Sequence, residues 1–464
     1  MTAAETIAAF AASITLDDVP ETVVEHAKLH VLDALGCGLA AHSTGNGVEG
    51  RATMQELGGE PQATVIGLAD RLPAASAAFA NAMTCHGLDF DDTHSDSGSH
   101  VSTVIAPAAF AAGERYGPDG RDVLAAIVAG NEIVCRVGMA APGAFHERGF
   151  HPTAICGVFG ATATVSRLAG FDAETATRAL GIAGSMASGI FAYLADGTPT
   201  KPIHPGWAAH GAHIATRLAH HGAAGPRSVF DAQFGIYHAY LGIEPGSSGL
   251  SEQLADLGSR WETLRIAYKP FPICHFGHGA VGAAVDAVEG RTFAPAEIAE
   301  VVVSVPGPWV PIVLEPAGEK KAPRSAYEGK FSLQYAVASM LVRGHAGVTD
   351  FTKAAIADPD VLAVAAKVSH EPRDFATYPE AFPGAARVVL ASGERLEHEL
   401  PYQKGAPENP WSANEVRAKF RANAELALPA EAALALEEAI LALEQQHDLT
   451  AALAPLTLRE AATV

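Results

Sequence analysis

The stretch from His86 to His100, HGLDFDDTHSDSGSH, holds four aspartates and three histidines within fifteen residues. Carboxylates and imidazoles at this density can bind a divalent cation, carry a phosphoryl group, or move protons without a metal. Each of these chemistries needs a different structural setting. The residues around the stretch therefore decide which chemistry is favoured.

Two interpretations of this stretch involve a metal or a phosphoryl group. Asp89–Thr93, DFDDT, matches the D-x-D-x-T pattern of aspartyl-phosphate phosphotransferases, in which the first aspartate ends a buried strand. The preceding residues are rich in alanine and predict a helix instead. The segment DDTHSD resembles the magnesium clusters of all-helical diphosphate lyases, which usually need a second acidic cluster and an aromatic-lined cavity. Aromatic residues make up only 7% of this sequence, and it offers no second cluster of that kind.

A solvated Asp/Ser loop that caps a helix is a third interpretation of the same stretch, since both residue types favour such positions. A zinc site is a further possibility. However, the sequence contains neither H-E-x-x-H nor a Cys/His ligand spacing. The segment GCGLAA at Gly36 matches a dinucleotide fingerprint only weakly. It lies inside a predicted helix, where close packing explains the glycines.

Other histidines and lysines stand just before or early in predicted helices. Three such clusters hold His151; Lys201 with His204, His210 and His213; and Lys269 with Cys274, His275 and His278. Helix N-termini attract anions, and a lysine adds positive charge there. This arrangement would suit a small substrate that carries several carboxylates.

Composition limits the classes of protein that fit. The 464 residues carry a formal net charge of −21 and a pI of about 5.3, which argues against binding to nucleic acid or anionic membranes. The five cysteines are scattered and odd in number, which is typical of free thiols in a reducing compartment. No signal-peptide pattern or apolar run of eighteen residues is found, and we expect a cytoplasmic protein.

The elements that must position these residues are mainly helices. Six Ala- and Leu-rich segments predict helices at 23–41, 74–88, 123–139, 153–169, 173–189 and 208–220. Beyond Trp261, the segments 297–306 and 385–402 predict strands, the second a hairpin around Ser392-Gly393, with a helix between them at 331–344. We therefore predict a mainly α fold: a large all-helical domain built from both chain ends, 1–262 and 405–464, with an inserted smaller α+β lid domain, 263–404.

Six segments, in the same order along nearly the whole chain, resemble the MmgE/PrpD family. They are VLDALGCGLAA, HGLDFDDTHSDSGSHVS, FHPTAICGVFGA, GTPTKPIHPGWAAHGA, YKPFPICHFGH and KFSLQYAVA, which begin at Val31, His86, Phe150, Gly197, Tyr268 and Lys330. The family includes 2-methylcitrate dehydratase, cis-aconitate decarboxylase and iminodisuccinate epimerase. The resemblance implies a helical domain with an inserted α+β lid, a homodimer, and no metal or organic cofactor.

The resemblance also implies a set of site residues. The predicted catalytic residues are Asp89, His100, His151, Lys201 and Lys269, and the predicted substrate-binding residues are Thr93, Lys201, Lys269, His275 and His278. The two lysines would hold substrate carboxylates, and the histidines at 100 and 151 would act as acid and base. Both roles serve a reaction that builds negative charge beside a carboxylate.

The chain also departs from the family pattern. Asp91 stands where many dehydratase-type members have asparagine, as it does in decarboxylase- and epimerase-like members. The segment HVS at His100 replaces His-Pro-Ser, and Cys274 stands where the decarboxylases place a histidine, one residue before His275. These departures leave dehydration, decarboxylation and epimerisation open.

The first hypothesis is a cofactor-independent lyase or isomerase acting on a small di- or tricarboxylate, of the 2-methylcitrate dehydratase or cis-aconitate decarboxylase type. An isomerase like iminodisuccinate epimerase is an alternative. A magnesium-dependent hydrolase or diphosphate lyase that uses DFDDT is a hypothesis from another class. A non-catalytic relative that binds a carboxylate is a third, which the retained Asp89, His151, Lys201 and Lys269 disfavour.

Overall fold

The computed structural model describes residues 1–195, 197–378 and 381–458. It divides into two compact units, the first formed by Met1–Ile266 with Ser412–Val464 and the second by Ala267–Trp411. The fold is mainly α, as the sequence predicts. Over these described ranges, no helix is both long and apolar enough to cross a membrane.

The first unit is helical, with the two-residue strand β1 (Thr93–His94) inside its acidic loop and with β2 (Ile266–Ala267) at its exit. Its α-helices are α1 (Ala3–Ser13), α2 (Glu21–Ser43), α3 (Val48–Leu57), α4 (Ala74–Cys85), α5 (Ser102–Tyr116), α6 (Gly120–Met139), α7 (Ala144–Glu147), α8 (Pro152–Leu168), α9 (Ala173–Ala183), α10 (Ile203–His220), α11 (Ile236–Leu241), α12 (Leu250–Leu254), α19 (Ala413–Ala424), α20 (Ala430–Leu441) and α21 (Leu449–Leu453).

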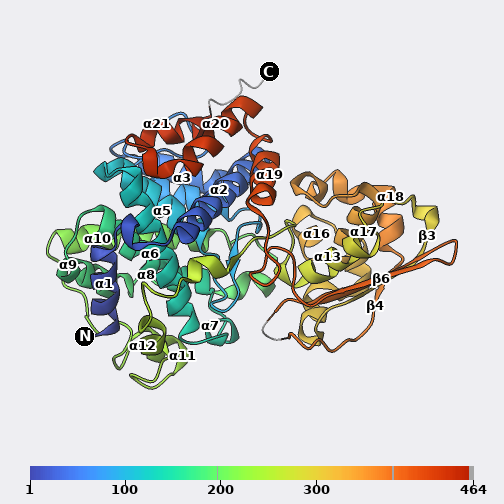
Figure 1. Ribbon diagram of the computed structural model, residues 1–464, viewed down its shortest axis with the longest axis horizontal. Helices are drawn as coiled ribbons and strands as arrows, with labels where there is room; N and C mark the ends of the chain where they lie inside the picture. The colour runs from blue at the N-terminus through green and yellow to red at the C-terminus, as the bar shows by residue number, and fades with distance from the viewer. Residues whose placement is uncertain (196, 379–380, 459–464) are drawn as a thin grey trace. The chain divides into compact units, whose positions relative to one another are not determined.

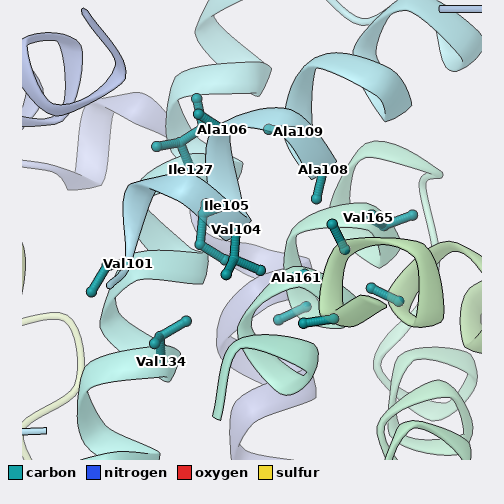
Figure 2. Close-up of a cluster of buried hydrophobic side chains, with 14 of the residues drawn as sticks. Val101, Val104, Ile105, Ala106, Ala108, Ala109, Ile127, Val134, Ala161 and Val165 are labelled. Atoms are coloured by element: carbon teal, nitrogen blue, oxygen red, sulfur yellow. The ribbon is translucent and has the colours of Figure 1, made fainter. Parts of the chain in front are cut away.

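The core of this unit forms where α5, α6 and α8 pack together. Figure 2 shows the side chains of Val104 and Ile105 from α5 between Val134 of α6 and Ala161 of α8. A Cβ added at Gly160 of α8 would lie 2.4 Å from Cγ2 of Val134, so the small residue lets the two helices approach. α5 is therefore held rigidly, and the acidic loop leads directly into it.

Segments distant in the sequence pack together in this unit, because α19 lies along α2 (Figure 1). A Cβ at Gly36 of α2 would lie 3.1 Å from the ring of Phe420, which confirms that packing explains the first glycine of GCGLAA. Beside this contact, the buried Lys419 Nζ lies 2.7 Å from Oδ1 of Asp33 and donates to the carbonyl of Phe90 at 2.8 Å. Helix α19 thus holds the backbone of the acidic loop.

The second unit is an α+β unit. Its elements are α13 (His278–Ala287), β3 (Ile298–Ser304), α14 (Val310–Val313), α15 (Ala317–Lys321), α16 (Ala326–Lys330), α17 (Leu333–Arg343), α18 (Pro359–Ala365), β4 (Val368–His370), β5 (Gly384–Leu390) and β6 (Arg395–Leu400). The sheet order is β4-β3-β5-β6, with β3 parallel to β4 and antiparallel to β5. β5 and β6 form the predicted hairpin, and α13 packs on both of them (Figure 1).

Replacing Lys419 with methionine would leave the Asp33 carboxyl buried without its cation. We expect the free energy of unfolding to fall by about 3–5 kcal/mol at pH 8, the range for breaking a buried ion pair. Burial raises the pKa of Asp33 to about 6, against the opposing effect of Lys419, so the folded chain holds this proton more tightly than the unfolded chain. The contribution of Asp33 to stability is therefore present at low pH and lost as the pH rises through about 6.

Urea unfolding of Lys419→Met at pH 5 and pH 8 measures this difference. The loss should be smaller at pH 5, where Asp33 can be protonated. The matched control is the double variant Asp33→Asn/Lys419→Met, which leaves no uncompensated charge and should recover much of the stability at pH 8. An equal loss at both pH values would contradict the role of the ion pair.

Candidate active site

The acidic loop connects α4 to α5, and most of it is buried. Asp91 and Asp92 expose 0% and 1% of their surface, so the stretch is not the solvated capping loop of the third interpretation. The loop follows a helix and a turn, whereas a phosphotransferase would need a strand before Asp89. Asp89 has φ of 54°, in the left-handed region that a residue with a Cβ rarely adopts. Such strain costs about 1–3 kcal/mol and often occurs at functional sites.

Asp92 fixes the position of the loop relative to α2 and α5. One carboxylate oxygen accepts the backbone N–H of Ser102 at 3.1 Å, and the other accepts its hydroxyl at 2.5 Å. The second oxygen also lies 2.9 Å from Nδ1 of His30 on α2. A carboxylate at the first turn of α5 satisfies a free backbone donor and interacts favourably with the helix dipole.

Asp91 binds two imidazoles. His86 Nδ1 lies 2.9 and 2.8 Å from the two carboxylate oxygens, and His100 Nδ1 lies 3.4 Å from one of them. Burial alone would raise the pKa of Asp91, but these two imidazoles lower it well below its usual value. Because Asp91 is ionised, His86 donates through Nδ1 and presents Nε2 to the other side of its ring.

His100 connects the loop to α8. Its backbone N–H donates to the hydroxyl of Thr153 at 2.9 Å, and its Nδ1 donates to the carbonyl of Asp92 at 2.9 Å. The hydroxyl of Thr93 lies 3.3 Å from the same nitrogen. These contacts leave Nε2 of His100 facing Lys201, whose Nζ lies 3.4 Å away.

Lys201 forms the cationic edge of the cluster. Its Nζ donates to Oδ1 of Asp89 at 2.8 Å, and both side chains are mostly buried. The same carboxylate oxygen lies 3.7 Å from Nε2 of His100. Lys201 precedes α10 and Asp89 follows α4, yet their side chains meet. This contact is expected if the two residues belong to one site.

His151 is the N-cap of α8 and is followed by Pro152, as predicted. Its Nδ1 lies 3.0 Å from Nδ1 of His204, which lies in the first turn of α10 and not before it. Burial, followed by the charge of Lys201, lowers the pKa of His151 well below its usual value, and burial lowers that of His204 to about 4. Both imidazoles are therefore neutral at pH 7.

The cluster contains two groups with the spacing of a metal site. One ligand atom from each of His86, His100 and His151 lies within 4.8 Å of the others, and the same holds for His86, Asp89, Asp91 and His100. Three neutral imidazoles would suit zinc. However, Lys201 already supplies a cation in contact with Asp89 and His100, which favours an anionic ligand at this edge.

The remaining predicted residues belong to the second unit. Lys269 is buried, His278 lies with Nε2 3.2 Å from the carbonyl of Ile273, and the ring of His275 packs on Phe382 with 4.2 Å between centroids. The side-chain amide of Gln403 contacts His275 Nε2. Their participation in the site of the first unit stays a prediction.

The structure also brings residues into the cluster that the sequence analysis did not select. His86 packs edge-on against His100, with 4.6 Å between ring centroids, and stacks with His151 at 5.8 Å. His86 and Asp91 are five residues apart in the same motif, but this spacing alone does not show that their side chains meet. The other two candidates, His210 and His213, bond to the backbone carbonyls of Ala75 and Ala108 on α4 and α5.

Comparison with known proteins identifies the family of the chain. The MmgE/PrpD N-terminal domain matches residues 5–247, and the MmgE/PrpD C-terminal domain matches residues 271–445. The chain therefore belongs to the MmgE/PrpD family.

The curated relatives that match most of the chain are decarboxylases by name. The cis-aconitate decarboxylase-like protein oryM of Aspergillus oryzae is 27% identical and covers 94% of this chain and 93% of its own. The cis-aconitate decarboxylases of Mus musculus and Homo sapiens are each 29% identical, covering 96% and 92% of this chain and 91% and 89% of their own. These matches indicate a lyase-type enzyme.

Acid should destabilise the first unit through two buried histidines, His146 on α7 and His204 on α10. The pKa values of His146 and His204 are lowered to about 4, mainly by burial, so the unfolded chain binds protons there that the folded chain excludes. Their contribution to stability is therefore complete above about pH 6.5 and is lost as the pH falls toward 4. The free energy of unfolding, measured in urea from pH 7.5 to 4, should decrease over this interval.

The matched control is His204→Gln, which removes one of these titrating groups and preserves a polar side chain. This variant should show a smaller decrease between pH 6.5 and 4 than the wild-type protein. The same pH dependence in both proteins would show that His204 does not titrate as the structure indicates.

Proposed function

We propose that the protein is a cofactor-independent lyase that decarboxylates a small unsaturated tricarboxylate such as cis-aconitate. The observation that carries this proposal is the pairing of Lys201 with Asp89 at the edge of a buried cluster of imidazoles. The lysine cation can hold a carboxylate of the substrate. An imidazole beside it can move a proton. The decarboxylase relatives support the choice of reaction.

The proposed reaction balances without a redox partner. The bond between the methylene carbon of cis-aconitate and its carboxylate breaks, and CO₂ leaves. The electron pair of that bond forms a terminal methylene double bond, and the electrons of the original double bond take up one proton at the former alkene carbon. The product is itaconate, and the step needs one proton from the enzyme for each CO₂ released.

The residues divide this work between binding and proton transfer. Lys201 holds a substrate carboxylate and disperses the negative charge that builds up as CO₂ leaves. His100 presents Nε2 toward Lys201 and can exchange a hydrogen bond with the substrate there, while Thr93 contacts Nδ1 of the same ring and is included as a hydrogen-bond donor by resemblance. The family resemblance also predicts roles for Lys269, His275 and His278, and these roles stay predictions.

A proton NMR assay in D₂O with a chelator present tests the proposed function. The panel contains cis-aconitate, citrate, 2-methylcitrate and iminodisuccinate. We expect methylene signals of itaconate from cis-aconitate, because the site supplies a cation and a proton donor without a metal. New olefinic signals from the hydroxy acids would indicate a dehydratase, and deuterium at the α-carbon without net product would indicate an epimerase.

The chelator makes the metal alternative testable in the same assay. Turnover that appears only after addition of Mg²⁺ or Zn²⁺ would contradict the cofactor-independent proposal. It would favour a metal bound by the cluster of His86, His100 and Asp91.

Lys201→Met should lower kcat/KM for cis-aconitate by about 10- to 100-fold. This loss corresponds to about 1.5–3 kcal/mol, the range for a hydrogen bond to a charged group. Lys201→Arg, which preserves the charge, is the matched control and should retain more activity than the methionine variant. Steady-state kinetics of the wild-type protein and the two variants measures this loss. Turnover by Lys201→Met at the wild-type rate would contradict the proposed role.

A further inference from the structure

His86 is the imidazole of the cluster that makes the closest carboxylate contact. Its side chain is fully buried, and Nδ1 contacts both oxygens of the ionised Asp91. Within the described part of the chain, Nε2 of His86 has no hydrogen-bond partner. A buried ring nitrogen without a partner requires a donor or acceptor that the protein itself does not supply.

The polar groups around His86 come from three parts of the first unit. Asp89, Asp91 and His100 lie in its own loop, His151 caps α8, and His204 begins α10. Two of these neighbours are carboxylates, and Asp91 is in direct contact. The Asp91 carboxylate therefore holds the ring of His86 in one orientation, with Nδ1 toward the carboxylate and Nε2 away from it.

The other imidazoles of the cluster are less suitable proton donors. Lys201 Nζ lies 3.4 Å from Nε2 of His100, so that nitrogen already faces an ammonium group of the protein. His151 and His204 pair through their Nδ1 atoms at 3.0 Å, and burial keeps both neutral. Among these four imidazoles, His86 therefore combines direct carboxylate contact with a ring nitrogen that lacks a partner in the described part of the chain.

We propose that His86 is a catalytic residue that donates the proton in the decarboxylation, and that Asp91 is its positioning residue. This inference rests on the proposed function. As CO₂ leaves, the Nε2–H bond of the His86 imidazolium breaks, and its proton forms the new C–H bond at the former alkene carbon. His86 remains as the neutral Nδ1–H form bonded to Asp91, and water from solvent returns the proton before the next turnover.

His86→Asn is the main test. The asparagine side-chain amide can still donate to Asp91, as Nδ1 of His86 does, but it provides nothing in place of Nε2. We expect kcat for cis-aconitate to fall by about 10²- to 10⁴-fold, the range for loss of a general acid, with KM changed by less than about threefold. His213→Asn is the matched control, because His213 is equally buried and bonds to the carbonyl of Ala108. This control should retain kcat within about twofold.

Asp91→Asn is the second test, and its readout is the pH profile. Loss of the carboxylate makes the imidazolium of His86 less stable, so the alkaline limb of kcat/KM should move to lower pH by about one unit or more. A structural role for Asp91 alone would lower the whole profile without moving this limb. Two results would overturn the proposal. One is a kcat of His86→Asn within threefold of the wild-type value. The other is an alkaline limb of kcat/KM that does not move in Asp91→Asn.

A readout without substrate separates this inference from the proposed function. Protein labelled with ¹³C at histidine Cε1 is titrated by NMR, and the His86 signal is identified by its absence in His86→Asn. If wild-type protein turns over no member of the panel, the proposed function fails. If the midpoint of the His86 NMR titration still moves to lower pH in Asp91→Asn, the pairing of His86 with Asp91 is supported. An unchanged titration midpoint would overturn it. If His86→Asn does not fold, His86→Gln takes its place in both experiments.

Discussion

Burial of the carboxylates of the acidic loop is the constraint on which the rest of the site depends. A carboxylate taken out of water without a partner costs several kcal/mol, so each one must meet a cation, an imidazole or a backbone donor. Asp89 meets Lys201, Asp91 meets two imidazoles, and Asp92 meets His30 and Ser102. The loop can adopt this buried path only because helices from distant parts of the chain supply these partners.

The same partners are the groups that could do chemistry, so stability and function draw on shared interactions. Asp91 holds His86 and His100 in fixed orientations and stabilises any positive charge on them. Lys419, more than three hundred residues further along the chain, contacts the backbone of Phe90 between two of the loop's aspartates. A change in α19 would therefore disturb the site without touching a reacting atom.

Much of the fold could be predicted because its signals are local. Alanine-rich stretches with small residues at the contacts predict helices such as α8, and β-branched runs flanking Ser392-Gly393 predict the β5–β6 hairpin. Helix starts were less accurate, since α10 begins at Ile203, five residues before the predicted start at 208. The turn Lys201-Pro202 ends the preceding segment, but Pro205 and Gly206 in the first helical turn are weak helix formers and hid the start of the helix.

The site was predicted in part, and the missing part has a physical cause. Motif resemblance placed Asp89, His100, His151 and Lys201 together, and the geometry agrees with a common site for these four. It did not select His86, because a sequence with twenty histidines does not show which ring packs against a buried carboxylate. Only the three-dimensional contact shows that Asp91 orients His86 and leaves its Nε2 without a protein partner.

The charges of the site also explain how an acidic protein could bind an acidic ligand. With a formal net charge of −21, the chain as a whole repels a polyanion, so the attraction must be local. Every buried aspartate of the loop has a partner within the first unit, so none of these carboxylates lacks a hydrogen bond or ion pair. An ammonium group has three donors, so Lys201 can keep its contact with Asp89 while it binds a carboxylate of the ligand. The local cation of Lys201 is therefore what makes an anion site feasible here.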